Sequence, residues 1–195
     1  MLDSSGSLKS DYQKGKDFVK TIAGEFNIGP DGSRAGVVTF SSKAEHNIKL
    51  KDHIDINSFN AAVDAIPLMG HQTRIDKALR LSQKELFAPE NGGRPTLPEV
   101  LILITDGKQT KADGAEDPSV VTNEMRKAGI HIIVIGIGSG TDQKELDNIA
   151  GGDGKAYVAK SFDEIIGEEF IDKLEEKTCH EGKHVPFVNL KLQPQ

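Results

Sequence analysis

The sequence is poor in aromatic residues and in cysteine. Aromatic side chains make up 5% of its 195 residues, tryptophan is absent, and Cys179 is the only cysteine. A single cysteine excludes a disulfide framework within the chain. It is compatible with a reducing compartment, or with one half of a bridge to a cysteine upstream of Met1. The core is therefore expected to be aliphatic.

Long apolar runs and basic clusters are also missing. The longest apolar run, residues 130–137, contains His131 and is too short to span a membrane, so no membrane insertion is expected. The formal net charge of −6, without any cluster of Lys or Arg, argues against a nucleic-acid partner. The length suits one domain with a sizeable core.

What the sequence does contain is an alternation of strand-like and helix-like segments. Strands are predicted at residues 34–40, 44–50, 100–104, 130–137 and 156–159, and helices at 8–26, 55–66, 73–87, 118–128, 142–150 and 162–177. Ser7 or its neighbour is expected to cap the first helix, and Asp55 the second. The alternation predicts an α/β fold, a doubly wound and mostly parallel central sheet flanked by helices. In such sheets ligands bind at the carboxyl ends of the central strands.

Oxygen-bearing side chains occur at three places that this fold can bring together. Asp3, Ser5 and Ser7 alternate in a turn at the start of the chain, Thr73 opens a helix, and Asp106 follows the strongest buried strand. If the strands before Asp3 and Asp106 are neighbours, two carboxylates and three hydroxyls converge at one sheet edge. Oxygen ligands without His or Cys favour Mg²⁺, or else Mn²⁺ or Ca²⁺, over zinc. We therefore predict a metal site that accepts a further carboxylate from outside the chain.

Each part of this pattern alone also has an ordinary structural explanation. Residues 3–7 are typical of a helix N-cap turn, Thr73 of a helix cap, and Asp106 with Gly107 of a turn after a strand. The glycine-rich residues 136–140 resemble a dinucleotide loop but lack its third glycine at the required place. We interpret them as a loop at a strand end.

The motifs together resemble a known family. Asp-x-Ser-x-Ser at residues 3–7, Thr73 followed by Lys77-Ala78-Leu79, and residues 104–107 (Ile-Thr-Asp-Gly) are similar to those of a von Willebrand factor A domain. The resemblance implies an A domain at residues 1–178 and a C-terminal extension at residues 179–195. It also implies that a metal-ion-dependent adhesion site (MIDAS) comprises five residues: Asp3, Ser5, Ser7, Thr73 and Asp106.

The resemblance is closest to matrix and adhesion members of the family, such as domains of collagens, matrilins and integrin α subunits. It implies a secreted or cell-surface protein-binding module, whose Mg²⁺ is completed by an acidic residue of a protein ligand such as collagen. It further implies a bridge from Cys179 to a cysteine before the first strand, and a closing helix at residues 162–177 that shifts when ligand binds. Two alternatives stay open: a structural A domain that binds without metal, and a metal-dependent hydrolase with His71 as the only nearby general base.

The sequence departs from the family pattern at two places. The first strand, normally about five or six residues long, is reduced to Met1 and Leu2, as expected if the chain begins late. Residues 185–192 are an alternative occupant of that position, although Pro186 disfavours a central strand. The second loop reads Gly70-His71-Gln72-Thr73 where the family more often has consecutive glycines. The bulkier side chains are expected to narrow access for a ligand.

Overall fold

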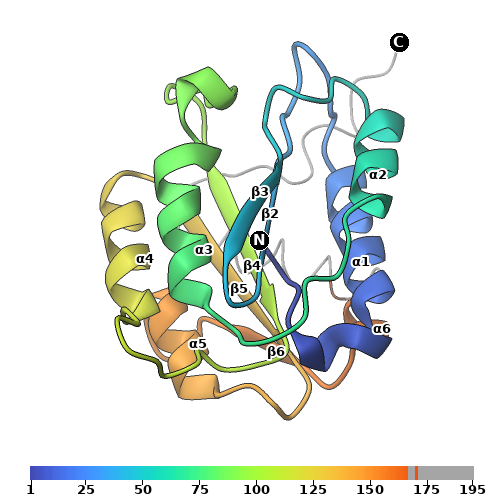
Figure 1. Ribbon diagram of the computed structural model, residues 1–195. Coiled ribbons are helices and arrows are strands. Elements are labelled where there is room, and N and C mark those ends of the chain that lie inside the picture. Colours follow the sequence, from blue (N-terminus) through green and yellow to red (C-terminus); the bar gives the residue numbers. More distant parts are fainter. Residues whose placement is uncertain (167–169, 171–195) are drawn as a thin grey trace.

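A parallel sheet forms the centre of the molecule in the computed structural model, which describes residues 1–166 and Phe170 (Figure 1). The described residues form six strands in the order β3-β2-β1-β4-β5-β6. The strands are β1 (Leu2–Asp3), β2 (Val37–Phe40), β3 (Ala44–Ile48), β4 (Val100–Thr105), β5 (His131–Ile137) and β6 (Tyr157–Ala159). Only β3 is antiparallel, because it returns from β2 as a hairpin. The predicted doubly wound α/β fold is confirmed.

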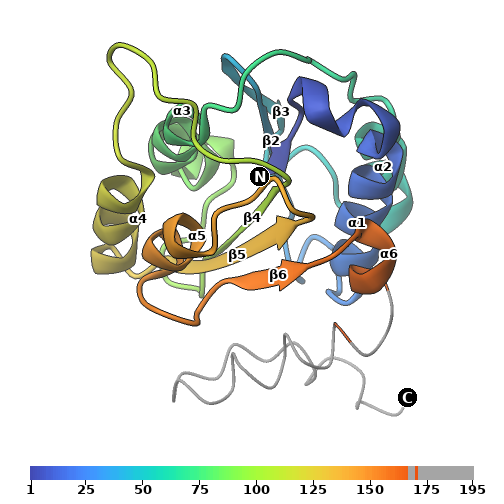
Figure 2. The same ribbon diagram turned by 90° about the horizontal axis from the view of Figure 1, so that it is seen from below.

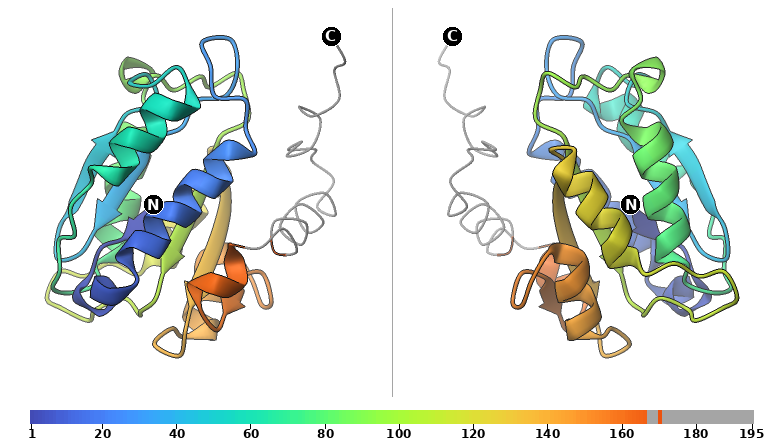
Figure 3. Two further views of the ribbon diagram at one scale, coloured as in Figure 1. Left: turned by 90° about the vertical axis from the view of Figure 1, so that its right-hand side faces the viewer. Right: turned by 90° about the vertical axis from the view of Figure 1, so that its left-hand side faces the viewer.

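Helices cover both faces of the sheet. They are α1 (Tyr12–Gly24), α2 (Ile56–Asp64), α3 (Ile75–Leu81), α4 (Pro118–Lys127), α5 (Gln143–Ala150) and α6 (Phe162–Ile165). Seen along the sheet from below, α1, α2 and α6 form one layer and α3, α4 and α5 the other (Figure 2). The two side views show each layer in turn (Figure 3). No helix within the described part of the chain is both long and apolar enough to cross a membrane.

The side chains of β4 show why both layers are needed. Leu101 and Leu103 belong to the core cluster under α3 and α4, while Ile102 and Ile104 join the cluster under α1 and α6. Successive residues of a strand point to opposite faces, so an unbroken apolar run requires helices on both sides. This arrangement leaves the carboxyl ends of the strands free to carry polar loops.

Two of the predicted helices differ from those observed. The segment predicted at residues 8–26 begins with a 3₁₀ turn, η1 (Gly6–Ser10), so Ser7 does not cap α1, which is preceded by Asp11. The segment predicted at residues 73–87 is α3 followed by a π-helical turn, η2 (Ser82–Leu86); a 3₁₀ turn, η3 (Pro89–Asn91), comes next. The Asp55 cap of α2 is confirmed, since its carboxylate accepts a hydrogen bond from Ser58 N at 2.9 Å.

The shortest strand, β1, lies in the middle of the sheet. Leu2 pairs with Thr39 of β2 and with Ile104 of β4, and Asp3 pairs with Phe40. Residues 185–192, considered above for this position, lie outside the described residues, as do Cys179 and most of the predicted closing helix beyond α6.

Candidate metal site

Three loops meet where β1 and β4 end. β1 and β4 are parallel neighbours, so the turn after β1 and Asp106, which follows β4, lie at the same edge of the sheet. The loop before α3 joins them, because Gly6 N donates to His71 O at 3.1 Å and Gly70 N donates to Ser4 O at 2.8 Å. The convergence predicted from the sequence therefore exists in the fold.

The Asp3 carboxylate is the buried end of the site. Its side chain is inaccessible to solvent. Oδ1 accepts a hydrogen bond from Ser5 N at 2.8 Å, and Oδ2 accepts one from Thr105 Oγ1 at 2.6 Å. One carboxylate oxygen is thereby held by the turn after β1 and the other by the last residue of β4.

A chain of oxygen atoms leads from this buried turn to the surface. Ser5 Oγ and Ser7 Oγ lie 3.1 Å apart, within hydrogen-bonding distance, and Ser7 Oγ donates to Asp106 Oδ1 at 2.9 Å. Ser5 is buried, whereas Ser7 is exposed and Asp106 is half-buried. Four of the five predicted ligand residues thus lie in one connected group that ends at solvent.

Thr73, the fifth residue, is buried two residues before α3, whose N-cap position is Arg74, and it faces the loop after β4, which we call the third loop. A methyl group added at Gly107 would lie 3.4 Å from Thr73 Oγ1, so the hydroxyl reaches the backbone just after Asp106. Thr73 N donates to Thr110 Oγ1 at 3.1 Å, and Thr110 N donates to Thr73 O at 2.8 Å. These two bonds fix Thr73 relative to the loop after β4.

Burial dominates the electrostatics of the two carboxylates. Burial raises the pKa of Asp3 to about 6, although hydrogen bonds from Thr105 and Ser5 lower it in part. Burial also raises the pKa of Asp106, against a hydrogen bond from Ser7. A bound cation would stabilise the ionised forms of these two carboxylates, because burial has removed part of the water that would otherwise do so. The described residues contain no group of three His, Cys, Asp or Glu side chains suited to a metal, so a cation here depends on the hydroxyls as well.

The chain matches a known protein family over most of its length. The model of the von Willebrand factor type A domain matches residues 1–172. The chain belongs to this family. The human collagen alpha-6(VI) chain is 31% identical over 164 residues, which cover 84% of this A domain chain and 7% of the collagen chain. Matrilin-1 of Gallus gallus is 29% identical over 183 residues, covering 92% of this chain and 36% of matrilin-1. The chain therefore spans only a small part of these extracellular matrix relatives.

Solved structures have the same fold. Proximal thread matrix protein 1 from the mussel byssus superposes with a TM-score of 0.77 at 32% identity, covering 88% of this chain and 44% of the mussel protein. The mussel protein has also been solved with a zinc-occupied MIDAS motif. Manganese-loaded TRAP of Plasmodium vivax has a TM-score of 0.68 at 22% identity, covering 85% and 68% of the two chains, and so supports the fold alone.

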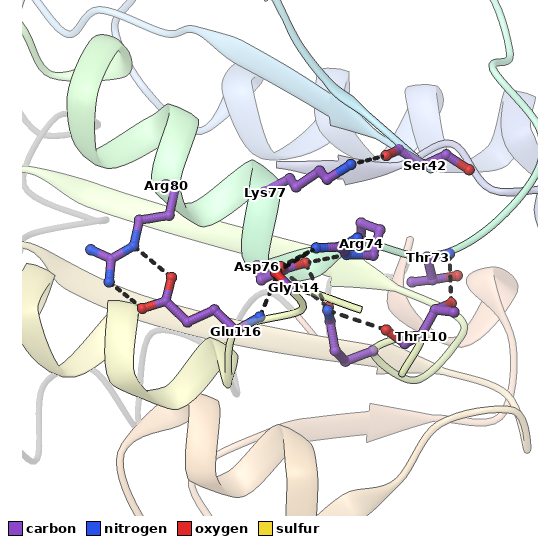
Figure 4. A network of polar contacts seen from close by, with 10 residues as sticks. Ser42, Thr73, Arg74, Asp76, Lys77, Arg80, Thr110, Gly114 and Glu116 are labelled. Atoms are coloured by element: carbon purple, nitrogen blue, oxygen red, sulfur yellow. Dashed lines mark hydrogen bonds and ion pairs between the residues drawn. The ribbon is translucent and has the colours of Figure 1, made fainter. Parts of the chain in front are cut away.

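A polar network centred on Asp76, which we call the Asp76 clamp, holds the third loop of this A domain against α3 (Figure 4). Arg74 Nε and Nη2 donate to the two Asp76 oxygens at 2.8 and 2.6 Å. Gln109 Nε2 donates to Oδ1 at 2.7 Å, and Glu116 N donates to Oδ2 at 3.1 Å. Burial opposes ionisation of Asp76, but these hydrogen bonds outweigh it and lower its pKa to about 2. The clamp therefore ties both ends of the loop after Asp106 to the helix that follows Thr73.

The glycine-rich loop after β5 also supports the site. A methyl group added at Gly140 would lie 2.5 Å from Asp106 O, closer than side-chain carbons approach a backbone oxygen. The loop that we interpreted only as a strand end therefore packs directly against the third loop of the A domain. Its glycine is required by this close approach.

Sequence reasoning missed several residues that position the predicted ligands. Thr105 falls just outside the strand predicted at residues 100–104, yet its hydroxyl donates to Asp3 Oδ2 at 2.6 Å and accepts a hydrogen bond from Gly107 N at 3.2 Å. Its polarity at the end of an apolar strand was the one available signal. Asp76 and Gln109 carry no comparable signal, because they are 33 residues apart and meet only through the sheet order.

Proposed function

We propose that this A domain is a divalent-cation-dependent protein-binding module. The observation that carries the proposal is the connected polar group that runs from the buried Asp3, through the backbone N–H of Ser5 and the hydroxyls of Ser5 and Ser7, to the half-buried Asp106. A protein ligand can reach the exposed end of such a site from solvent, while the buried end fixes the site to the central sheet. Membership of the A-domain family and the matrix relatives support the protein-binding part of this proposal.

The residues fit a hard cation. Asp3, Ser5, Ser7, Thr73 and Asp106 would hold it, with two carboxylates and three hydroxyls as the donor set, which favours Mg²⁺. The zinc-occupied MIDAS of the mussel relative supports a divalent cation at this place in the family. When bound, the cation supplies an electrophilic centre for a carboxylate of the ligand. The residues of the chain orient that centre through Thr105, Thr110 and the Asp76 clamp.

The proposed setting is extracellular, with a matrix protein such as collagen as the ligand. The relatives reported above are extracellular matrix proteins, and a bridge from Cys179 to a cysteine outside this chain belongs to the same proposal. We do not propose hydrolysis. His71, the general base considered from the sequence, presents its backbone carbonyl to Gly6 while the residue itself is exposed to solvent.

The test measures binding of the metal ion and binding of the protein ligand in separate experiments. Isothermal titration of Mg²⁺ into the metal-free protein should give one site, which Asp3→Ala and Thr73→Ala abolish without changing the circular dichroism spectrum. Ser10→Ala, which removes an exposed hydroxyl outside the site, serves as the matched control. Solid-phase binding to immobilised collagens should then be lost in chelator and restored by Mg²⁺.

The structural alternative predicts a different outcome. It rests on the hydrogen bonds that the predicted ligands already make, Ser7 with Asp106 and Asp3 with the neighbouring Thr105. A structural A domain would bind its partner equally well in chelator and in Mg²⁺. Collagen binding that survives both chelator and Asp3→Ala would establish that alternative and reject ours.

A further inference from the structure

The loop between α2 and α3 brings Thr73 to the candidate metal site. Residues 66–74, which we call the α2–α3 loop, contain no helix or strand of their own. Their path therefore depends on hydrogen bonds to neighbouring elements. The turn after β1 holds the middle of the loop, since Ser4 Oγ accepts a hydrogen bond from Met69 N and Ser4 O accepts one from Gly70 N, each at 2.8 Å.

Helix α1 holds the beginning of the same loop. Tyr12 Oη donates to Pro67 O at 3.2 Å. Lys16 Nζ donates to Ile66 O at 3.5 Å, and to the carbonyl oxygen of Asp64, the last residue of α2, at 2.9 Å. Tyr12 and Lys16 are four residues apart, so they share one face of α1, and this helix lies beside α2 (Figure 3). The chain is thus fixed at the point where it leaves α2.

Lys16 is an unusual residue for this position. It is buried, and it forms no ion pair within the part of the chain that the structure describes. Lys20, one turn further along α1, binds the Asp64 carboxylate at 2.7 Å. Lys16 Nζ has only the two carbonyl oxygens and the Tyr12 ring, whose centre lies 5.5 Å away, in place of the water lost on burial. A methionine would fill a similar volume without that desolvation cost, so packing alone does not explain a lysine here.

We propose that Lys16 and Tyr12 are positioning residues for the candidate metal site, on which they act through the α2–α3 loop. This inference rests on the proposed function, in which Thr73 is one of the five ligands of the cation. The last carbonyls of a helix have no partner within the helix, and Lys16 supplies a donor to the one at Asp64. This bond and the one from Tyr12 fix the direction in which the chain leaves α2 towards Ser4.

Removing these bonds should loosen the α2–α3 loop in the metal-free protein. The conformational freedom that the loop gains has to be lost again when Thr73 joins a bound cation. The affinity for the cation therefore falls, because a loop already held in its binding geometry loses less freedom on binding. Lys16 is not one of the proposed ligands, so it acts on affinity only through the order of the loop.

The test compares Lys16→Met with Lys20→Met in the full chain. Lys16→Met keeps the length of the side chain and removes both donor contacts, whereas Lys20→Met removes the neighbouring ion pair with Asp64. In the metal-free Lys16→Met protein, hydrogen exchange followed by NMR should be about tenfold faster or more at the amides of Met69 and Gly70. Exchange in the β4–β5 ladder, which reports opening of the core, should change much less. Lys20→Met should leave both regions as in wild type.

The affinity for Mg²⁺ is the second measurement. Isothermal titration should give a Kd about tenfold higher for Lys16→Met and an unchanged Kd for Lys20→Met. Tyr12→Phe is a milder variant, which removes only the hydroxyl that donates to Pro67 O. It should change the exchange of the loop amides and the Kd in the same direction, by a smaller factor.

Two outcomes would overturn the inference. Equal acceleration of the loop amides and the β4–β5 amides in Lys16→Met would show that Lys16 stabilises the fold as a whole. Unchanged loop exchange and unchanged Mg²⁺ affinity in Lys16→Met and Tyr12→Phe would show that the loop is fixed without α1. A wild-type protein that binds no Mg²⁺ would instead reject the proposed function, and the exchange data, which need no metal, would still support or reject the fixing of the loop by Lys16.

Discussion

His71 carries the one backbone conformation in the described chain that is unfavourable for its residue type. Its φ of 72° is the only positive value at a non-glycine position among the described residues, and it follows Gly70 at 77°. A side chain in the left-handed region costs roughly 1–2 kcal/mol. Glycine adopts a positive φ without this cost, which explains why the family more often has consecutive glycines here. The structure also shows both His71 and Gln72 exposed beside the site.

Replacing His71 by glycine should stabilise the protein. His71→Gly removes the strain, and the gain in free energy of unfolding should be about 1 kcal/mol after the entropy cost of glycine is counted. Urea denaturation at pH 7 measures it. Gln72→Gly is the matched control, since Gln72 has no positive φ, and it should destabilise. A His71→Gly protein no more stable than wild type would contradict the strain argument.

Thr105 is a second residue whose substitution should change the stability of the protein through local contacts. Thr105→Val keeps the shape of the side chain but removes the donor to Asp3 Oδ2 and the acceptor for Gly107 N. A buried carboxylate that loses a hydrogen bond costs about 1–3 kcal/mol. We expect the free energy of unfolding at pH 7 to fall by that amount, and Mg²⁺ affinity to fall with it. Thr105→Ser keeps the hydroxyl and should restore most of both; equal stability of the valine variant would reject the assigned role.

At the scale of elements, the Asp76 clamp makes the contact between α3 and the loop after β4 dependent on pH. The pKa of Asp76 in the folded state, about 2, lies below its ordinary value of 3.8. A lowered pKa means that the unfolded chain binds more protons in this range. The stabilisation is therefore complete above pH 4 and is lost as the pH falls towards 2.

The expected size of this effect is about 2 kcal/mol. The difference in free energy of unfolding between wild type and Asp76→Asn should be largest near pH 5 and should shrink by that amount at pH 2. The other carboxylates titrate alike in wild type and in Asp76→Asn, so their contribution cancels in the difference. Asp113→Asn, at an exposed acid of the same loop, should show no such change with pH. A constant difference for Asp76→Asn would mean that the clamp holds the loop without its charge.

The elements also show how far the sequence alone can lead. The apolar run of β4 and the β2–β3 hairpin followed from periodicity, because their burial is decided by neighbouring residues in the chain. The π-helical turn at Ser82–Leu86 and the 3₁₀ turn at Gly6–Ser10 did not follow, since tertiary packing overrides helical periodicity at both places. The three loops of the candidate site were predicted from their oxygen-rich motifs. Their supports, Thr105, Gly140 and the Asp76 clamp, required the order of the strands.

At the scale of the whole molecule, the candidate metal site depends on a central strand of two residues. Leu2 is fully buried and pairs with both neighbouring strands, β2 and β4. Asp3, the last residue of β1, lies where the three loops meet. Asp3 is held by its pairing with Phe40 and by hydrogen bonds from Ser5 N and Thr105 Oγ1. A cation that joins all three loops would add cross-links between segments that are far apart in the chain.

We expect a bound cation to raise the stability of the protein strongly. A ligand that binds only the folded state raises the free energy of unfolding by about 2.7 kcal/mol when its concentration is one hundred times its Kd. For a chain of this length that corresponds to a rise in Tm of roughly 5–10 °C. Differential scanning calorimetry with Mg²⁺ and with chelator measures the rise, which Asp3→Ala should abolish and Ser10→Ala should leave intact. A structural A domain without a functional site gives no rise in either protein, and a rise that persists in Asp3→Ala places the cation elsewhere on the chain.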